Sequence, residues 1–137
     1  MNSIKDPQGI IEATDHGFRV CGVPVEFRYS YDENRALTGC YAFALIHDNV
    51  VAGFSRVHSE HDLGGGVKHL GRTTAAARLN IRMRVEGPRK GTITFSRQEA
   101  HVFTIEEDLN IHEEAFWEDV IPQLRLEELY ERLVKRS

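Results

Sequence analysis

The stretch CYAFALIHDNVVAGFSRV, residues 40–57, decides the fold. Its first part, Cys40 to Ile46, is apolar at every position, which is typical of a strand buried on both faces in the middle of a sheet. Asp48-Asn49 follows, and both residue types tolerate the positive φ that a two-residue hairpin turn requires. A second, largely apolar run from Val50 to Val57 then returns along the first. The stretch therefore predicts a tight hairpin in which Cys40 faces Val57.

Shorter strand patterns lie on both sides of this hairpin. Residues 25–31, VEFRYSY, alternate between apolar and polar side chains, as in a strand buried on one face. Residues 78–85, RLNIRMRV, alternate in the same way, and residues 92–96 return after a turn that contains Gly87-Pro88. Matching the apolar faces of these two runs places Arg82 opposite Ser96 in a second hairpin. Weaker strands are predicted over residues 9–14, 18–21 and 100–105.

The last part of the chain has the pattern of amphipathic helices. Apolar side chains recur at helical spacing from Leu126 to Val134. Asn110 and Glu113 have the residue types and the spacing of a helix N-cap pair. Pro122 is expected to kink the helix or to restart it.

These patterns predict a single α+β domain over residues 1–137, with strands over about 9–105 and helices over about 110–136. The expected architecture is a curved, mostly antiparallel sheet of seven or eight strands with the C-terminal helices packed on it. A partly open barrel is the specific form that we expect. A chain of 137 residues buries about two-thirds of its extended surface, which is enough for one core without disulfides.

Composition excludes several classes of protein. The chain is 41% hydrophobic and 28% charged, as in ordinary soluble domains rather than collagens or disordered tails. Its longest apolar run has seven residues, well short of the about 20 that a transmembrane helix needs, and the N-terminal residues lack the apolar region of a signal peptide. Cys21 and Cys40 lack the spacing of a metal site and are expected to be free thiols. We therefore expect a soluble, cytoplasmic protein with no membrane partner.

Charge is distributed unevenly along the chain. The formal net charge is −4, from 17 basic and 21 acidic residues. Residues 64–98 have eight basic residues and one acidic residue, a net charge of +7, whereas residues 99–137 have four basic and eleven acidic residues, a net charge of −7. Arginine makes up 13 of the 17 basic residues, and its planar guanidinium group suits carboxylate and phosphate partners. The middle of the chain is therefore predicted to bind anions.

The predicted anion site lies on one face of the 78–85 run. Arg78, Arg82 and Arg84 would project from the same side of a strand, and Lys68 and Arg72 precede them in the sequence. The leading interpretation is a non-catalytic binding module whose partner is a nucleic acid, a phosphate or an acidic protein surface. The alternative is an ordinary solvated face, or one neutralised by the chain's own acidic helices. The sequence indicates no oligomeric state.

A histidine-containing loop supports a catalytic alternative. His58, His61 and His69 lie near Lys68 and Arg72 in the sequence. Two imidazoles beside cations could cleave RNA without a metal, because one would accept the 2′-hydroxyl proton and the other would protonate the leaving oxygen. The HExxH zinc motif is absent from the sequence, so neither a metal nor another cofactor is predicted.

A third hypothesis concerns the tyrosines. Tyr29, Tyr31 and Tyr41 would line the inside of a barrel if the sheet closed, where they could contact a small apolar ligand. The alternative is that these side chains belong to the hydrophobic core, with their hydroxyl groups at its rim.

Overall fold

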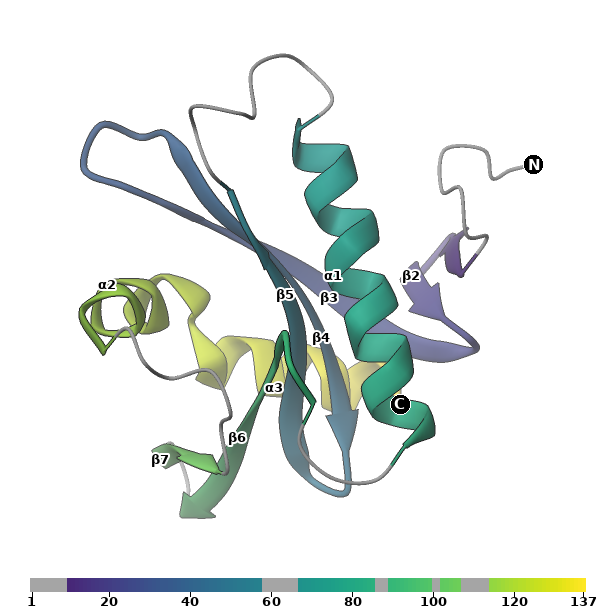
Figure 1. Cartoon of the computed structure of the whole chain (residues 1–137). Coiled ribbons are helices and arrows are strands. Elements are labelled where there is room, and N and C mark those ends of the chain that lie inside the picture. Colours follow the sequence, from purple (N-terminus) through teal and green to yellow (C-terminus); the bar gives the residue numbers. More distant parts are fainter. Residues whose placement is uncertain (1–9, 58–66, 86–88, 100–101, 107–113) are drawn as a thin grey trace.

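The computed structural model describes residues 10–57, 67–85, 89–99, 102–106 and 114–137. Within these ranges, five strands precede a long helix, two strands follow it, and two helices come last (Figure 1). The strands are β1 (Ile11–Thr14), β2 (Gly17–Val20), β3 (Val23–Tyr31), β4 (Leu37–Ile46), β5 (Asn49–Arg56), β6 (Thr92–Glu99) and β7 (Val102–Glu106). The helices are α1 (Val67–Arg84), α2 (Glu114–Leu124) and α3 (Leu126–Arg136).

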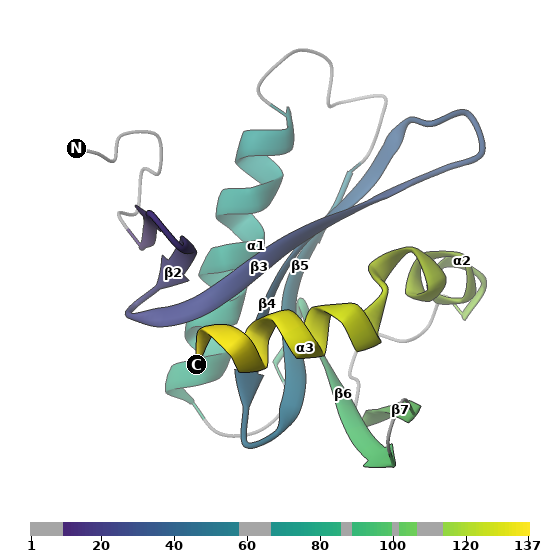
Figure 2. The same cartoon turned by 180° about the vertical axis from the view of Figure 1, so that it is seen from behind.

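The strands form one antiparallel sheet of seven strands, in which each strand pairs with its neighbours in the sequence. The order β1 to β7 leaves β1 and β7 as the two edges, so the described sheet is curved but open. Helix α1 covers one face of the sheet, and α2 and α3 cover the other (Figures 1 and 2). The predicted α+β class, the curved antiparallel sheet of seven or eight strands and the packing of the C-terminal helices on it are confirmed, and the sheet is open.

The central strand β4 determines how closely helices approach each face. Tyr41 and Phe43 belong to the core under α2 and α3, whereas Ala42 and Ala44 belong to the core under α1. All four side chains are fully buried. Successive side chains of a strand point to opposite faces, so this alternation of large and small residues builds an aromatic core on one face. On the other face it leaves room for a helix to lie close to the backbone.

The hairpin over residues 40–57 is confirmed, but its register differs from the prediction by two residues. Cys40 faces Ser55 rather than Val57, and the turn consists of His47-Asp48 instead of Asp48-Asn49. Both turn residues have positive φ, 49° at His47 and 69° at Asp48. Histidine and aspartate both occur in this conformation more often than most residues, so either dipeptide could close the turn. A shift of two residues keeps each side chain on its predicted face.

The run at residues 78–85 is helical, so the predicted second hairpin and the pairing of Arg82 with Ser96 are wrong. These residues form the end of α1 and the residue after it, and β6 pairs with β5 and β7 instead. The three consecutive alanines before the run have high helix propensity. Leu79 and Met83, which are four residues apart, pack on the sheet from one side of the helix.

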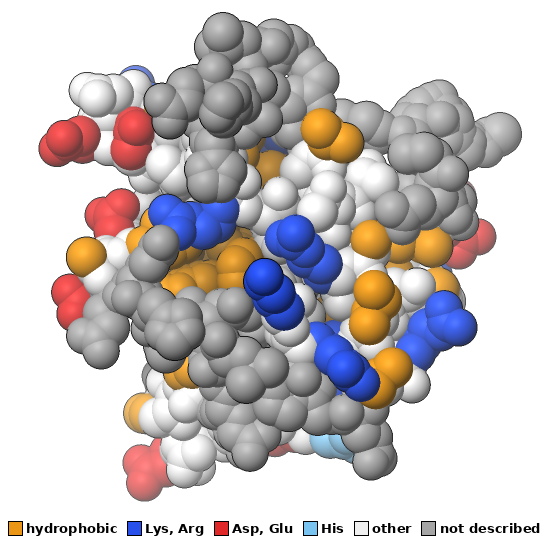
Figure 3. Space-filling view, viewed as in Figure 1, with side chains coloured by type: hydrophobic (Ala, Val, Ile, Leu, Met, Phe, Trp, Pro, Cys, Tyr) orange, Lys and Arg blue, Asp and Glu red, His pale blue; other side chains and the backbone are white. Residues whose placement is uncertain are grey.

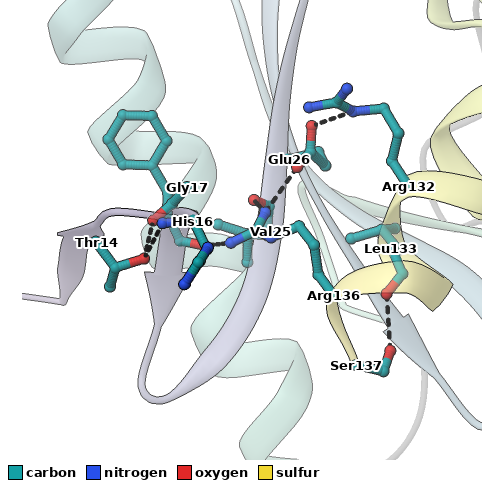
Figure 4. A network of polar contacts seen from close by, with 10 residues as sticks. Thr14, His16, Gly17, Val25, Glu26, Arg132, Leu133, Arg136 and Ser137 are labelled. Carbon is teal, nitrogen blue, oxygen red and sulfur yellow. Dashed lines mark hydrogen bonds and ion pairs between the residues drawn. The ribbon is translucent and has the colours of Figure 1, made fainter.

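Helix α3 is fixed to the sheet by a network around Glu26 (Figure 4). Arg132 Nε donates to Glu26 Oε1 at 2.9 Å, and Arg136 Nη1 donates to Glu26 Oε2 at 2.7 Å. Arg136 also donates to the carbonyl oxygens of Phe18 and Val25. The network therefore ties the end of α3 to both β2 and β3.

The break between the two C-terminal helices falls at Arg125, whose φ is 51°, and Pro122 lies inside α2. Of the two expectations for Pro122, the restart is therefore wrong, because the new helix begins after Arg125, three residues later, and the kink stays a prediction. The predicted N-cap pair of Asn110 and Glu113 lies outside the described residues.

Candidate binding surface on helix α1

Helix α1 lies directly on the alanine face of the sheet. Ala75, Ala76 and Leu79 are fully buried in the core between α1 and the sheet. Gly53 on β5 allows this close approach, because a Cβ atom there would come closer than 3.0 Å to the backbone of Ala75 and Leu79. The contact leaves the opposite side of α1 turned away from the sheet.

The side of α1 that points away from the sheet has an apolar centre. Helical spacing places Leu70, Ile81 and Val85 on one line along this side, with Thr74 and Ala77 between them. Leu70 is 61% exposed, Ile81 50% and Val85 38%. One exposed aliphatic side chain is ordinary, but a line of them on one helix is typical of an interaction surface. We define the α1 outer face as Leu70, Thr74, Ala77, Arg78, Ile81, Arg84 and Val85.

Arginines border this apolar line on both sides. Arg78 Nη1 donates a hydrogen bond of 2.7 Å to the carbonyl oxygen of Phe54, which holds the guanidinium group against β5. Arg84 is exposed in the last turn of α1, and Arg89 and Lys90 are exposed shortly after it. Neither Arg78 nor Arg84 takes part in an ion pair among the described residues. Figure 3 shows basic and hydrophobic side chains beside one another on this face, with acidic side chains toward its margins.

Because residues 78–85 are helical, the three arginines predicted to share one strand face point in different directions. Arg78 and Arg84 lie on opposite borders of the α1 outer face. Arg82 lies closer to the sheet, and its Nε atom is buried without a hydrogen-bond acceptor in the described part of the chain. Only two of the three are therefore available to a partner on the outer face.

The other two cations of the predicted anion site are packed on aromatic rings. The guanidinium carbon of Arg72 lies 5.3 Å from the ring centre of Phe18 and 5.6 Å from that of Phe27. Lys68 Nζ lies 4.1 Å from the ring centre of Tyr29. Burial raises the pKa of Tyr29, and the positive charges of Arg72 and Lys68 oppose that shift. These two cations therefore support the packing of α1 on β2 and β3.

The acidic C-terminal helices do not cover the α1 outer face, because they lie on the other side of the sheet (Figures 1 and 2). Three side chains of α3, Glu128, Arg132 and Arg136, instead form ion pairs with residues of β3. Glu128 of α3 lies 3.0 Å from Arg28, and Arg132 of α3 lies 2.9 Å from Glu26. The alternative in which acidic helices neutralise the basic segment therefore does not apply to this face.

The histidines of the catalytic alternative lie largely outside the described residues. This is the case for His58 and His61, and His69 lies in α1 but its side chain is not described. Among the side chains that are described, no group of three His, Cys, Asp or Glu residues could hold a metal ion. No helix in the described ranges is long and apolar enough to cross a membrane. The ribonuclease-like interpretation stays a hypothesis from the sequence.

The three tyrosines do not line one cavity. Tyr41 is buried under α2 and α3, where its hydroxyl group lies 2.8 Å from that of Ser30. Burial raises the pKa of Tyr41 to about 12, although the hydrogen bond with Ser30 opposes this. Tyr29 and Tyr31 lie on the α1 side of the sheet, where Lys68 Nζ donates to the Tyr31 hydroxyl oxygen at 3.3 Å. This division between two faces gives the small-ligand hypothesis no support.

The sequence pattern alone missed the apolar half of the candidate surface. Read as a strand, the 78–85 run places Ile81 and Val85 inside the protein, whereas the helix exposes both. The helical spacing of residues 70, 74, 77, 81 and 85 is the signal that could have identified them. No family model, curated protein or solved structure matches this chain.

Proposed function

We propose that this protein is a small interaction module whose α1 outer face binds an acidic surface of a partner protein. The observation that carries the proposal is the exposed line of Leu70 and Ile81 on α1 and Val85 directly after it, between arginines, with no acidic residue in the helix. Burial of aliphatic side chains supplies affinity, at about 25 cal/mol per Å² of apolar surface. The guanidinium groups supply selectivity, because they form bidentate hydrogen bonds with carboxylates.

An acidic protein fits this face better than a nucleic acid does. Nucleic acids are bound by rows of cations along the phosphate backbone and by aromatic rings that stack on unpaired bases. Helix α1 contains no Phe, Tyr or Trp, and its most exposed uncharged side chains are aliphatic. Protein interfaces combine an apolar centre with a polar rim, which is the arrangement of the α1 outer face.

Selection from a random peptide library of about 16 residues, on the immobilised full chain, tests the proposal. We expect the enriched peptides to combine Asp or Glu with Leu, Ile or Phe. Replacing both Leu70 and Ile81 with Gln should lower their affinity at least about tenfold, which corresponds to the loss of about 55 Å² of apolar burial. Replacing both Arg78 and Arg84 with Gln should weaken binding mainly at low salt, where charges are least screened.

Lys135→Gln is the matched control, because it removes an exposed cation from α3, on the other face of the sheet. A mixed-sequence RNA of about 20 nucleotides is the competing probe. If the arginine variant abolishes RNA binding and the Leu70/Ile81 variant leaves it unchanged, a nucleic acid replaces the acidic protein as the partner. The absence of enriched peptides, or peptides whose binding neither α1 variant changes, would refute the proposal.

A further inference from the structure

A groove on the other side of the molecule complements the α1 outer face. It lies between α2, α3 and β7 and has a volume of about 600 Å³, within the range of ligand pockets, about 300–1,000 Å³. Its lining includes Phe103, Ile121 and Leu126 together with Glu127, Glu128 and Glu131, and Arg125 is the one basic residue among the described lining residues. We call it the acidic groove.

The two surfaces have matching apolar character and opposite charge. The α1 outer face is aliphatic and bordered by Arg78 and Arg84, whereas the acidic groove is apolar and bordered by three glutamates. Glu131 is exposed and is found in no ion pair among the described residues. A partner that brings arginines to this groove would therefore gain ion pairs without breaking existing ones at Glu131.

We propose that the α1 outer face of one copy of this chain docks into the acidic groove of a second copy. The proposal rests on the proposed function, because it uses the same face of α1 and names its partner. The two surfaces lie on opposite faces of one sheet, so they cannot meet within one chain (Figures 1 and 2). Two docked copies leave one α1 face and one groove open, so the contact is head-to-tail and extends into a longer assembly or closes into a ring.

Sedimentation of the full chain over a range from about 1 µM to about 500 µM tests the proposal. At low salt the average mass should rise above the 15.6 kDa of one chain as the concentration increases. In about 0.5 M NaCl it should return toward 15.6 kDa, because salt screens the pairing of arginines with glutamates.

Two double variants separate the two halves of the contact. Leu70→Gln with Ile81→Gln replaces the two most exposed apolar side chains of the α1 outer face and leaves the acidic groove intact. Glu127→Lys with Glu131→Lys reverses charge at the groove and leaves α1 intact. Each variant alone should stay at 15.6 kDa, whereas an equal mixture should form a species of twice that mass and no larger, because each chain offers one intact surface. Glu12→Gln, an exposed position on β1, is the control and should associate as the wild type does.

A wild-type chain that stays at 15.6 kDa at the highest concentration would overturn the self-docking proposal. A mixture of the two variants that forms no dimer would also overturn it, as would association that both variants retain. If the enriched acidic peptides still bind α1 in those cases, the proposed function stands and its partner is a different protein. If neither a second copy nor any peptide binds α1, both proposals fail.

Discussion

Replacing Gly53 with Ala should displace α1 from the sheet. The added Cβ would come closer than 3.0 Å to the carbonyl oxygen of Ala75 and the amide nitrogen of Leu79, and it would lie 3.0 Å from Leu79 Cα. Ordinary contacts of this kind begin at 3.4 Å, and all three atoms are backbone atoms that no side-chain rotation can move. Overpacking of a core costs about 1–3 kcal/mol, and a clash with rigid backbone belongs at the upper end of that range.

A loss of about 3 kcal/mol should lower the melting temperature by about 10 °C, because unfolding entropy is about 2.1 cal/mol/K per residue. Thermal unfolding followed by circular dichroism measures this change. Gly22→Ala is the control: its φ is +82° and nothing lies within 4 Å of an added Cβ, so it tests backbone strain without overpacking. That strain costs about 1–2 kcal/mol. If Gly53→Ala melts no lower than Gly22→Ala, then α1 does not lie on β5 as closely as described.

The remaining predictions concern the other face of the sheet. The pKa of Tyr41 is about 12 in the folded protein, against 10.0 for an ordinary tyrosine. Its stabilisation is therefore complete below pH 10.0 and is lost as the pH rises through about 12. Tyr41→Phe should reduce the alkaline loss, to which Tyr29 also contributes because burial raises its pKa, and should lower stability at neutral pH by about 1 kcal/mol in urea unfolding. An unchanged alkaline loss would contradict the raised pKa of Tyr41. Glu26→Gln should cost about 2–4 kcal/mol, because it leaves Arg136, whose side chain is 13% exposed, without its carboxylate partner. Glu128→Gln should lower the free energy of unfolding by at most about 0.5 kcal/mol, since the Glu128 side chain is 54% exposed. Equal losses in the two variants would contradict the argument that burial strengthens the pair of Glu26 with Arg136.

The fold class could be predicted from the sequence because strands that are adjacent in the sequence are also adjacent in the sheet. Each strand pairs with the strand before and after it, so the apolar runs and the turns between them carry most of the topology. The hairpin over residues 40–57 illustrates this, since its faces are correct although its turn lies one residue earlier than predicted. The exact turn could not be predicted, because His47, Asp48 and Asn49 are all residues that accept positive φ.

Helix α1 could not be recognised from the 78–85 run alone. Apolar residues at 79, 81, 83 and 85 fit one face of a strand, whereas the helix buries Leu79, partly buries Met83 and exposes Ile81. Tertiary contacts decide between strand and helix for this run. Ala42, Ala44 and Gly53 leave space on the sheet, and a helix with alanines on its inner side fills that space. The candidate site depended on the same choice. In a strand, Arg78, Arg82 and Arg84 would project from one face. In the helix, an apolar line lies between Arg78 and Arg84, and Arg82 lies closer to the sheet.

The net charge of −4 describes neither face of this molecule. Five of the eight basic residues of the 64–98 segment belong to α1 on one side of the sheet, and the acidic C-terminal segment contributes α2 and α3 on the other. Packed layers are spaced by about 10 Å, so roughly 20 Å separates the two helical layers. The Debye length at physiological ionic strength is about 8 Å, so a charge on one face is largely screened from the other. An acidic partner at α1 therefore meets a positive surface, and a basic partner at the acidic groove meets a negative one, although the chain as a whole is anionic.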